Sequence, residues 1–131
     1  MKVILDTNIL MSAIFWGGKP RKIVDLWLTG AFVLVASKEI VAEYDEIFHR
    51  LNKKYKTADE VLFNTIVSHL QLYTSPILAH QVCEDPDDDK FLACAMVSAA
   101  RYIVSGDKLL LQVETFGSCQ IITASDFLSG M

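Results

Sequence analysis

The chain has 131 residues, of which 52% are hydrophobic and only 6 are Gly and 3 are Pro, which favours one folded domain over residues 1–131 and argues against disorder. Its 3 scattered Cys and 3 His lack the spacings that are typical of thiol or zinc enzymes. A formal net charge of -4 argues against a nucleic-acid-binding domain, because such domains are usually basic.

The N-terminal residues do not resemble a targeting segment. They reach the acid Asp6 after a short apolar run at residues 3–5, which is too short for the core of a signal peptide. No apolar run elsewhere approaches the roughly 20 residues that a membrane-spanning helix needs. We therefore expect a cytoplasmic protein that does not contact a membrane.

Short apolar runs rich in Val, Ile, Phe and Tyr predict strands. They cover residues 3–5, 32–36, 102–105 and 120–122. None of them alternates apolar with polar residues, which favours strands covered on both faces and hence a parallel sheet. Residues 71–82 are ambiguous, because Pro76 favours either an edge strand or an extended segment.

Segments with helical periodicity lie between these runs. The first begins near Pro20 and ends near Gly30, the second follows Ser37 as N-cap, and the third follows a capping box at residues 57–60. Two more begin at Asp89, with Met96 on the buried face, and at Ala124 or Ser125. The alternation predicts an α/β fold with three layers, α/β/α, around a mainly parallel central sheet.

Acidic residues occupy the positions where strands of this sheet end. Asp6 follows the run at residues 3–5, and Asp107 follows the run at 102–105. Asp89 begins a helix that would start at the same edge, where open parallel sheets form their active crevice. Glu43 lies beside the apolar stripe of the helix after Ser37, with Glu39 as a lesser rival.

Acids gathered at one crevice repel one another unless a divalent cation lies between them, and an all-oxygen site suits Mg²⁺ or Mn²⁺. Such an ion can activate water and stabilise charge on a phosphodiester. Asn8 and Ser105 are polar residues that could orient the ligands, and Asp85, Asp87 or Asp88 could assist or replace Asp89. The predicted catalytic and metal-binding residues are Asp6, Glu43, Asp89 and Asp107.

The charge balance is compatible with RNA once these acids are assigned to a metal. Removing 4 of the 16 acids leaves 12, equal to the 12 Lys plus Arg. Two basic clusters are then candidates for phosphate contacts, although such clusters are more often solvated surface. Their residues are Lys19, Arg21, Lys22, Lys53, Lys54 and Lys56.

Each of these features also has an ordinary interpretation. Acids in the first turn of a helix stabilise its dipole, Asp6 could serve as a turn or cap residue, and Glu43 could lie on the surface. The apolar residues Met11, Phe15 and Trp16 are most simply core or dimer contacts. Only the joint occurrence of the acids favours a metal site.

The order of these motifs resembles the PIN-domain nucleases over nearly the whole chain. The matching residues are Val-Ile-Leu-Asp6-Thr7-Asn8, the helical Glu43, Asp89 before Lys-Phe-Leu-Ala-Cys-Ala, and Ser105-Gly106-Asp107. The stretch Asp-Pro-Asp-Asp-Asp-Lys-Phe-Leu is similar to the branch that contains toxin components of toxin-antitoxin systems.

The resemblance implies a Mg²⁺- or Mn²⁺-dependent endoribonuclease that hydrolyses RNA phosphodiester bonds. It also implies a homodimer held inactive by an antitoxin protein, and it assigns the family's acidic quartet to the four acids already singled out. Two alternatives remain. A non-catalytic RNA- or protein-binding module on the same fold would be expected to lack one of the acids, and a phosphatase with Asp6 as nucleophile would usually carry a second Asp where this chain has Asn8.

Overall fold

The computed structural model describes all residues, 1–131, and contains a six-stranded sheet in the order β3-β2-β1-β4-β6-β5. Every neighbouring pair is parallel except β5 and β6, which are antiparallel. The mainly parallel α/β fold predicted from the sequence is confirmed. The strands are β1 (Lys2–Leu5), β2 (Val33–Ser37), β3 (Gln71–Tyr73), β4 (Tyr102–Val104), β5 (Thr115–Phe116) and β6 (Cys119–Ile122).

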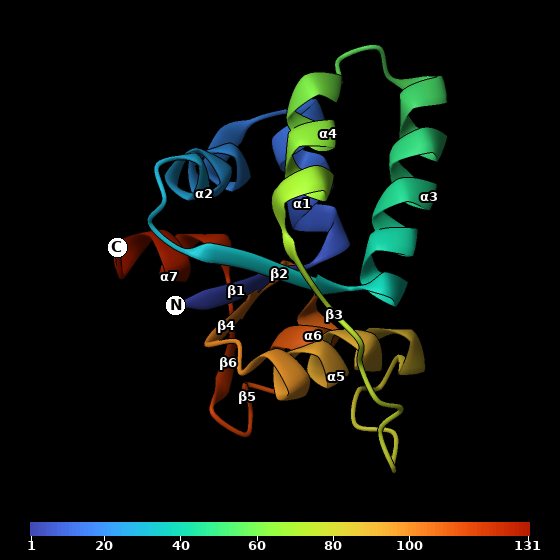
Figure 1. Ribbon diagram of the computed structural model, residues 1–131, viewed down its shortest axis with the longest axis vertical. Coiled ribbons are helices and arrows are strands. Elements are labelled where there is room, and N and C mark those ends of the chain that lie inside the picture. Colours follow the sequence, from blue (N-terminus) through green and yellow to red (C-terminus); the bar gives the residue numbers. More distant parts are fainter.

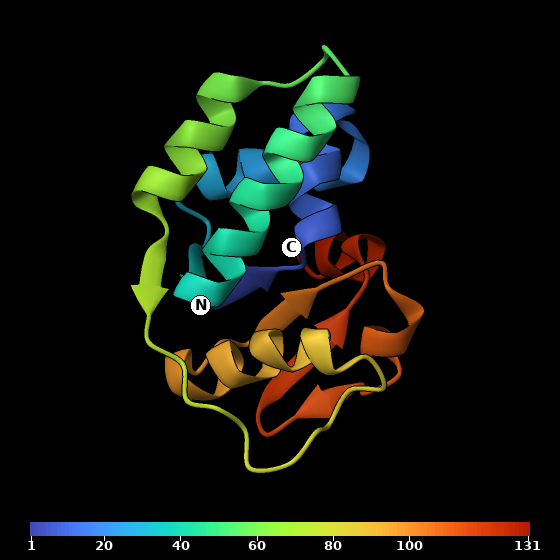
Figure 2. The same ribbon diagram turned by 90° about the vertical axis from the view of Figure 1, so that its right-hand side faces the viewer.

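Helices cover both faces of this sheet. Figure 1 shows α1 to α4 on one side and α5 and α6 on the other, and Figure 2 shows the same layers after a quarter turn. The helices are α1 (Thr7–Phe15), α2 (Gly18–Leu28), α3 (Lys38–Lys54), α4 (Glu60–His69), the short 3-10 helix η1 (Pro86–Asp88), α5 (Asp89–Ser98), α6 (Lys108–Leu111) and α7 (Ala124–Ser129).

The two central strands, β1 and β4, are buried on both faces. Val3, Ile4, Ile103 and Val104 are all 0% exposed. This explains why the strand sequences do not alternate, since neither face of a central parallel strand meets water. No helix is long and apolar enough to cross a membrane. Strands from residues 2 to 122 share one sheet, and the organisation as one domain stays a prediction.

Some local details differ from the sequence predictions. The third helix begins at Glu60, because the Asp59 carboxylate accepts a hydrogen bond from the Leu62 amide at 3.0 Å and acts as the N-cap. The sequence does not predict the strand β5, because two residues are too few to show the apolar pattern of a strand. Met96 is 53% exposed rather than buried, because the sheet covers only one side of α5.

The chain changes direction across the sheet between β1 and β4. The strands β2 and β3 extend the sheet on one side of β1, and β4, β6 and β5 extend it on the other. Crossovers that diverge in this way leave a crevice at the carboxyl ends of the strands where they part. Leu5 pairs with Val104, so the residues that follow, Asp6 and Ser105, lie beside each other at that point.

Candidate active site

Asp6 and Asp107 are joined through Ser105 at the carboxyl ends of β1 and β4. The Ser105 hydroxyl donates a hydrogen bond to Asp6 Oδ2 at 2.6 Å, and its oxygen accepts one from the Asp107 amide at 3.0 Å. Asp6 is 6% exposed. Burial raises the Asp6 pKa in spite of hydrogen bonds from Ser105 and the Thr7 amide, and the charges of Glu43 and Asp107 raise it further. A cation among these acids would relieve this cost.

Asp88, the last residue of η1, lies close enough to Asp6 and Asp107 for their charges to change its pKa. Burial is the main cause that raises the Asp88 pKa to about 7, and the negative charges of Asp107, Asp6 and Asp85 add to it. Asp88 Oδ2 is buried and has no hydrogen-bond partner. An unpaired buried carboxylate oxygen is costly. Asp88 therefore needs either a proton, which a hydrogen bond with Asp107 favours, or a cation.

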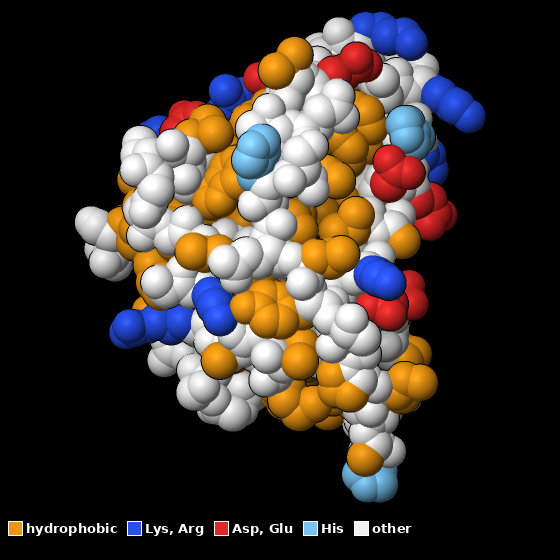
Figure 3. Space-filling view, viewed as in Figure 1, with side chains coloured by type: hydrophobic (Ala, Val, Ile, Leu, Met, Phe, Trp, Pro, Cys, Tyr) orange, Lys and Arg blue, Asp and Glu red, His pale blue; other side chains and the backbone are white.

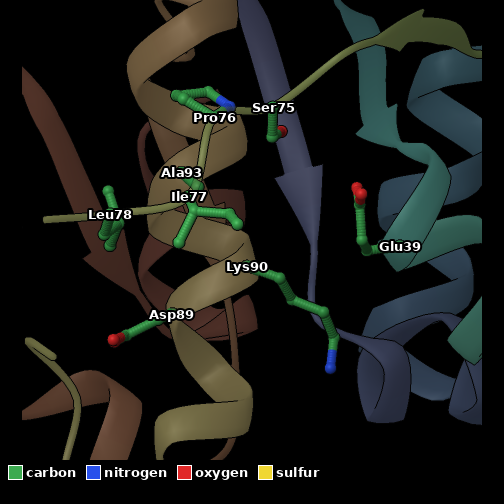
Figure 4. A pocket seen from close by; sticks show the side chains of 8 residues that line it. All are labelled: Glu39, Ser75, Pro76, Ile77, Leu78, Asp89, Lys90 and Ala93. Atoms are coloured by element: carbon green, nitrogen blue, oxygen red, sulfur yellow. The ribbon is translucent and has the colours of Figure 1, made fainter.

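Asp89, the first residue of α5, binds the preceding loop instead. Its Oδ1 accepts a hydrogen bond from the Cys83 amide at 2.7 Å, and its Oδ2 accepts one from the Val82 amide at 3.1 Å. Burial opposes ionisation, but these hydrogen bonds outweigh it and lower the Asp89 pKa. Figure 4 shows Asp89 and Lys90 pointing in different directions from α5. The structure therefore does not bring Asp89 to the other predicted acids; the residue before it lies there.

Both oxygens of Glu43, on α3, have partners. The Thr7 hydroxyl donates a hydrogen bond to Oε2, and the Lys90 ammonium on α5 lies 2.8 Å from Oε1. The side chains of Lys90 and Glu43 are only 17% and 25% exposed. The next residue of α3, Tyr44, donates a hydrogen bond to the Leu5 carbonyl, which fixes α3 to the end of β1. Glu43 thus lies at the edge of the acidic cluster as half of an ion pair.

A pocket of about 190 Å³ adjoins this ion pair, between α3, α5 and the loop after β3 (Figure 4). The rival acid Glu39 lines this pocket together with Asp89 and Lys90. The remaining wall consists of loop residues 75–78 and Ala93. Glu39 therefore faces a neighbouring hollow and not the acids at the ends of β1 and β4.

The other predicted polar helpers have separate positions. Asp85 caps η1, because its carboxylate accepts a hydrogen bond from the Asp87 amide at 3.0 Å. Asn8 is exposed in the first turn of α1, two residues after Asp6. Of this group, only Asn8 lies directly beside the strand end with its side chain open to a ligand.

The predicted RNA contacts divide into two groups. On α2, Lys19 donates a hydrogen bond to Ser125 at 2.7 Å, and Arg21 pairs with Asp25 and Asp59 at 3.1 and 3.2 Å. The remaining predicted contacts are exposed and form no ion pair: Lys22, Lys53, Lys54 and Lys56. The cluster at the end of α3 is thus the one in which no predicted contact forms an ion pair.

Sequence reasoning missed Lys90 and Thr7, and it left the choice between Asp88 and its neighbours open. The sequence does indicate a role for Lys90. A positive charge in the first turn of a helix opposes the helix dipole, which indicates a compensating acid nearby. The sequence does not indicate the role of Thr7, because its contact with Glu43 joins residues 36 positions apart.

The donors at the strand ends are those that a hard divalent cation prefers. Asp6, Asp88 and Asp107 offer carboxylate oxygens, one of which is buried and unpaired, and oxygen ligands suit Mg²⁺ and Mn²⁺. No three His, Cys, Asp or Glu side chains stand close enough together to hold a metal ion as they are. The fit of a metal therefore rests on the donor chemistry and on the unpaired Asp88 oxygen.

The architecture defines a class of protein: a mainly parallel α/β domain with carboxylates gathered where its central strands diverge. The PIN domain family matches residues 2–109, and the chain belongs to this family. Its members are typically nucleases and generally use divalent metals. The family predicted from the sequence motifs is therefore confirmed.

Three proteins are similar to this chain, one in sequence and two in fold. The uncharacterized protein MJ1680 of Methanocaldococcus jannaschii is 32% identical over 118 residues, which cover 87% of this chain and 76% of that protein. The crystal structure of PAE2754 from Pyrobaculum aerophilum superposes with a TM-score of 0.63 at 12% identity, covering 99% of this chain and 88% of that one. VapBC2 from Rickettsia felis, bound to a DNA fragment from its promoter, contains a chain with a TM-score of 0.63 at 14% identity, covering 94% and 98%. At these identities the two crystal structures show a shared fold.

Proposed function

We propose that this protein is a Mg²⁺- or Mn²⁺-dependent endoribonuclease that hydrolyses RNA phosphodiester bonds. The observation that carries the proposal is the buried, unpaired Oδ2 of Asp88 beside Asp6 and Asp107, at the carboxyl ends of the central strands. These three carboxylates are the proposed metal ligands. Membership of a family whose members are typically nucleases supports the same function.

The side chains around the acids have distinct roles in this proposal. A divalent cation bound there supplies an activated water and neutralises charge on the phosphate. Ser105 holds Asp6 in one orientation through its hydrogen bond. Lys90 neutralises Glu43 and so reduces the repulsion that a phosphodiester meets at the site. Asn8, exposed beside Asp6, is placed to donate a hydrogen bond to the substrate.

Cleavage of end-labelled single-stranded RNA by the purified protein tests the proposal. We expect cutting with Mn²⁺ or Mg²⁺, none with EDTA, and a loss of at least about 100-fold in the Asp6→Asn variant. Asp126→Asn, an exposed acid on α7, is the matched control and should cut like wild type. Equal activity of wild type and Asp6→Asn would reject the proposal, and RNA binding without cutting would favour the non-catalytic module.

We also propose that the protein is the toxin of a toxin-antitoxin pair and forms a homodimer. The similar fold of a chain in VapBC2 supports the first part. Exposed apolar side chains, which include Val61 and Ile77, support association with a partner. Induced expression should arrest growth of a bacterial host for wild type but not for Asp6→Asn. Light scattering of the purified protein measures the number of subunits.

A further inference from the structure

The helix α1 exposes a single stripe that begins at the acids. Asn8 and Trp16 are exposed and Ser12 is half-buried, whereas the other residues from 7 to 15 are buried. Asn8 and Ser12 are four residues apart and lie on one face of the helix, and Trp16 follows four residues later as its C-cap. At 1.5 Å per residue, the stripe is about 12 Å long. It connects the proposed cleavage site with the far end of the helix layer.

Trp16 at the end of this stripe is an exposed aromatic platform. Its side chain is 58% exposed, so of the two interpretations from the sequence, core or dimer contact, the core is wrong for Trp16. The Trp16 ring meets the Tyr55 ring edge-on at a centroid distance of 5.3 Å, and Lys54 Nζ lies 5.3 Å from the centre of the Tyr55 ring. The indole is thus held in place by its contact with Tyr55, and the exposed part of its surface is open to a planar partner.

Positive charge lies beside this platform, at the end of α3. The segment from residue 47 to residue 58 contains Arg50, Lys53, Lys54 and Lys56 and no acid, although the whole chain has a net charge of -4. None of the four forms an ion pair. Figure 3 shows Lys and Arg side chains gathered around the end of α3. A second copy docked symmetrically on this tip would bring like charges together, whereas a polyanion is attracted.

We propose that single-stranded RNA runs from the acidic cluster along the exposed stripe of α1 to Trp16, where one base stacks on the indole. Lys54 and Lys53 contact the backbone phosphates beside that base. Aromatic stacking combined with a positive groove is how proteins hold single strands without reading their sequence. This inference rests on the proposed ribonuclease function and specifies its substrate as single-stranded RNA of several nucleotides.

Tryptophan fluorescence tests the stacking contact directly. The chain has 2 Trp, and Trp27 lies beside the start of β2 with Val33 and Gly30, away from the carboxyl ends of the strands. The Trp27→Phe variant therefore leaves Trp16 as the only reporter. With EDTA present to prevent cutting, titration with short oligouridine or oligoadenine RNA should quench Trp16 strongly. Trp16→Phe, which reports Trp27 alone, should show little change.

Affinity measurements on the same metal-free RNA test the energetic role. We expect Trp16→Ala to weaken binding about tenfold and Trp16→Phe to stay within about threefold of wild type, as for other stacked bases. Lys54→Gln should weaken binding and reduce its salt dependence. Arg101→Gln removes the same charge just before β4, at the end away from the acids. It should change neither the RNA affinity nor its salt dependence.

The results separate this inference from the proposed function. Suppose that wild type cuts RNA with Mn²⁺, but RNA does not quench Trp16 fluorescence and binds Trp16→Ala and Lys54→Gln as tightly as wild type. The path along α1 is then wrong and the nuclease function stands. A change of subunit number in Trp16→Ala with unchanged RNA affinity would assign Trp16 to a protein interface and also overturn the inference. If wild type neither binds nor cuts RNA, both proposals fail.

Discussion

At the scale of single residues, acids that look alike in the sequence have different surroundings. Asp85 caps η1, Asp88 faces Asp6 and Asp107, and Asp89 binds two amides of the preceding loop. The direction of each side chain decides its role, because successive residues of a helical turn point about 100° apart. The acids crowded between residues 85 and 89 therefore have three separate structural roles.

Substitution of the two neighbouring aspartates separates these tasks. We expect Asp88→Asn to lower the rate of metal-dependent RNA cleavage at least about 100-fold, because it removes a proposed ligand. Asp89→Asn should keep most of the activity but lower the free energy of unfolding by about 1–2 kcal/mol, since it weakens charge-assisted hydrogen bonds from the Cys83 and Val82 amides. Cleavage rates and urea unfolding measure the two effects. The opposite pattern would return the ligand role to Asp89.

The raised Asp88 pKa predicts how the stability of the metal-free protein depends on pH. Its ordinary value is 3.8 and the folded value is about 7, so the folded state keeps a proton that the unfolded state has lost. The stabilising contribution is complete below pH 3.8 and is lost as the pH rises through about 7. Urea unfolding with EDTA across this range should show a flatter pH dependence for Asp88→Asn than for wild type. Asp126→Asn should follow wild type; equal slopes for all three proteins would contradict the prediction.

At the scale of elements, the ion pair of Lys90 and Glu43 links α5 and α3, which lie on opposite faces of the sheet. The contact lies at the carboxyl edge of the sheet, where Tyr44 of α3 also donates a hydrogen bond to the Leu5 carbonyl at the end of β1. It therefore fixes the two walls of the acidic crevice relative to each other.

Breaking this pair should destabilise the protein measurably. We expect Lys90→Met to lower the free energy of unfolding by about 1–2 kcal/mol, less than the roughly 3–5 kcal/mol of a fully buried pair, because both side chains are partly exposed. In a Glu43→Gln background the same substitution should cost much less. Lys22→Met, an exposed lysine on α2, should have little effect. Equal losses from Lys90→Met in both backgrounds would show that the two residues are not coupled.

The elements that the sequence predicted are those with a strong local pattern. The central strands were recognised from continuous apolar runs, and α3 from its N-cap at Ser37, which accepts a hydrogen bond from the Ile40 amide at 3.3 Å. The strand β5 has two residues and pairs only with β6, so its existence depends on a neighbour and not on its own pattern. The capping-box pattern favours Thr57 as the cap of α4, but Asp59 also suits that position, and the structure uses Asp59.

At the scale of the whole molecule, a bound metal should stabilise the fold. An ion that binds the folded chain and not the unfolded chain adds about 2.7 kcal/mol at a free concentration of 100 times its Kd. We expect Mn²⁺ or Mg²⁺ to raise the Tm of wild type by several degrees and EDTA to reverse this. The increase should be much smaller for Asp88→Asn and unchanged for Asp126→Asn, as measured by calorimetry. An equal increase in all three proteins would place the ion elsewhere.

The sequence by itself determined the fold class, the family and the strand ends at Asp6 and Asp107. Continuous apolar runs indicate strands that are buried on both faces, and the polar residue after each run marks the end of the strand. Only the tertiary structure decided which acids meet. It turned Asp88 toward the cluster, tied Asp89 to a loop and joined Glu43 to Lys90. These choices depend on side-chain direction and on contacts between residues far apart in the chain, and neither is encoded in the spacing of residue types.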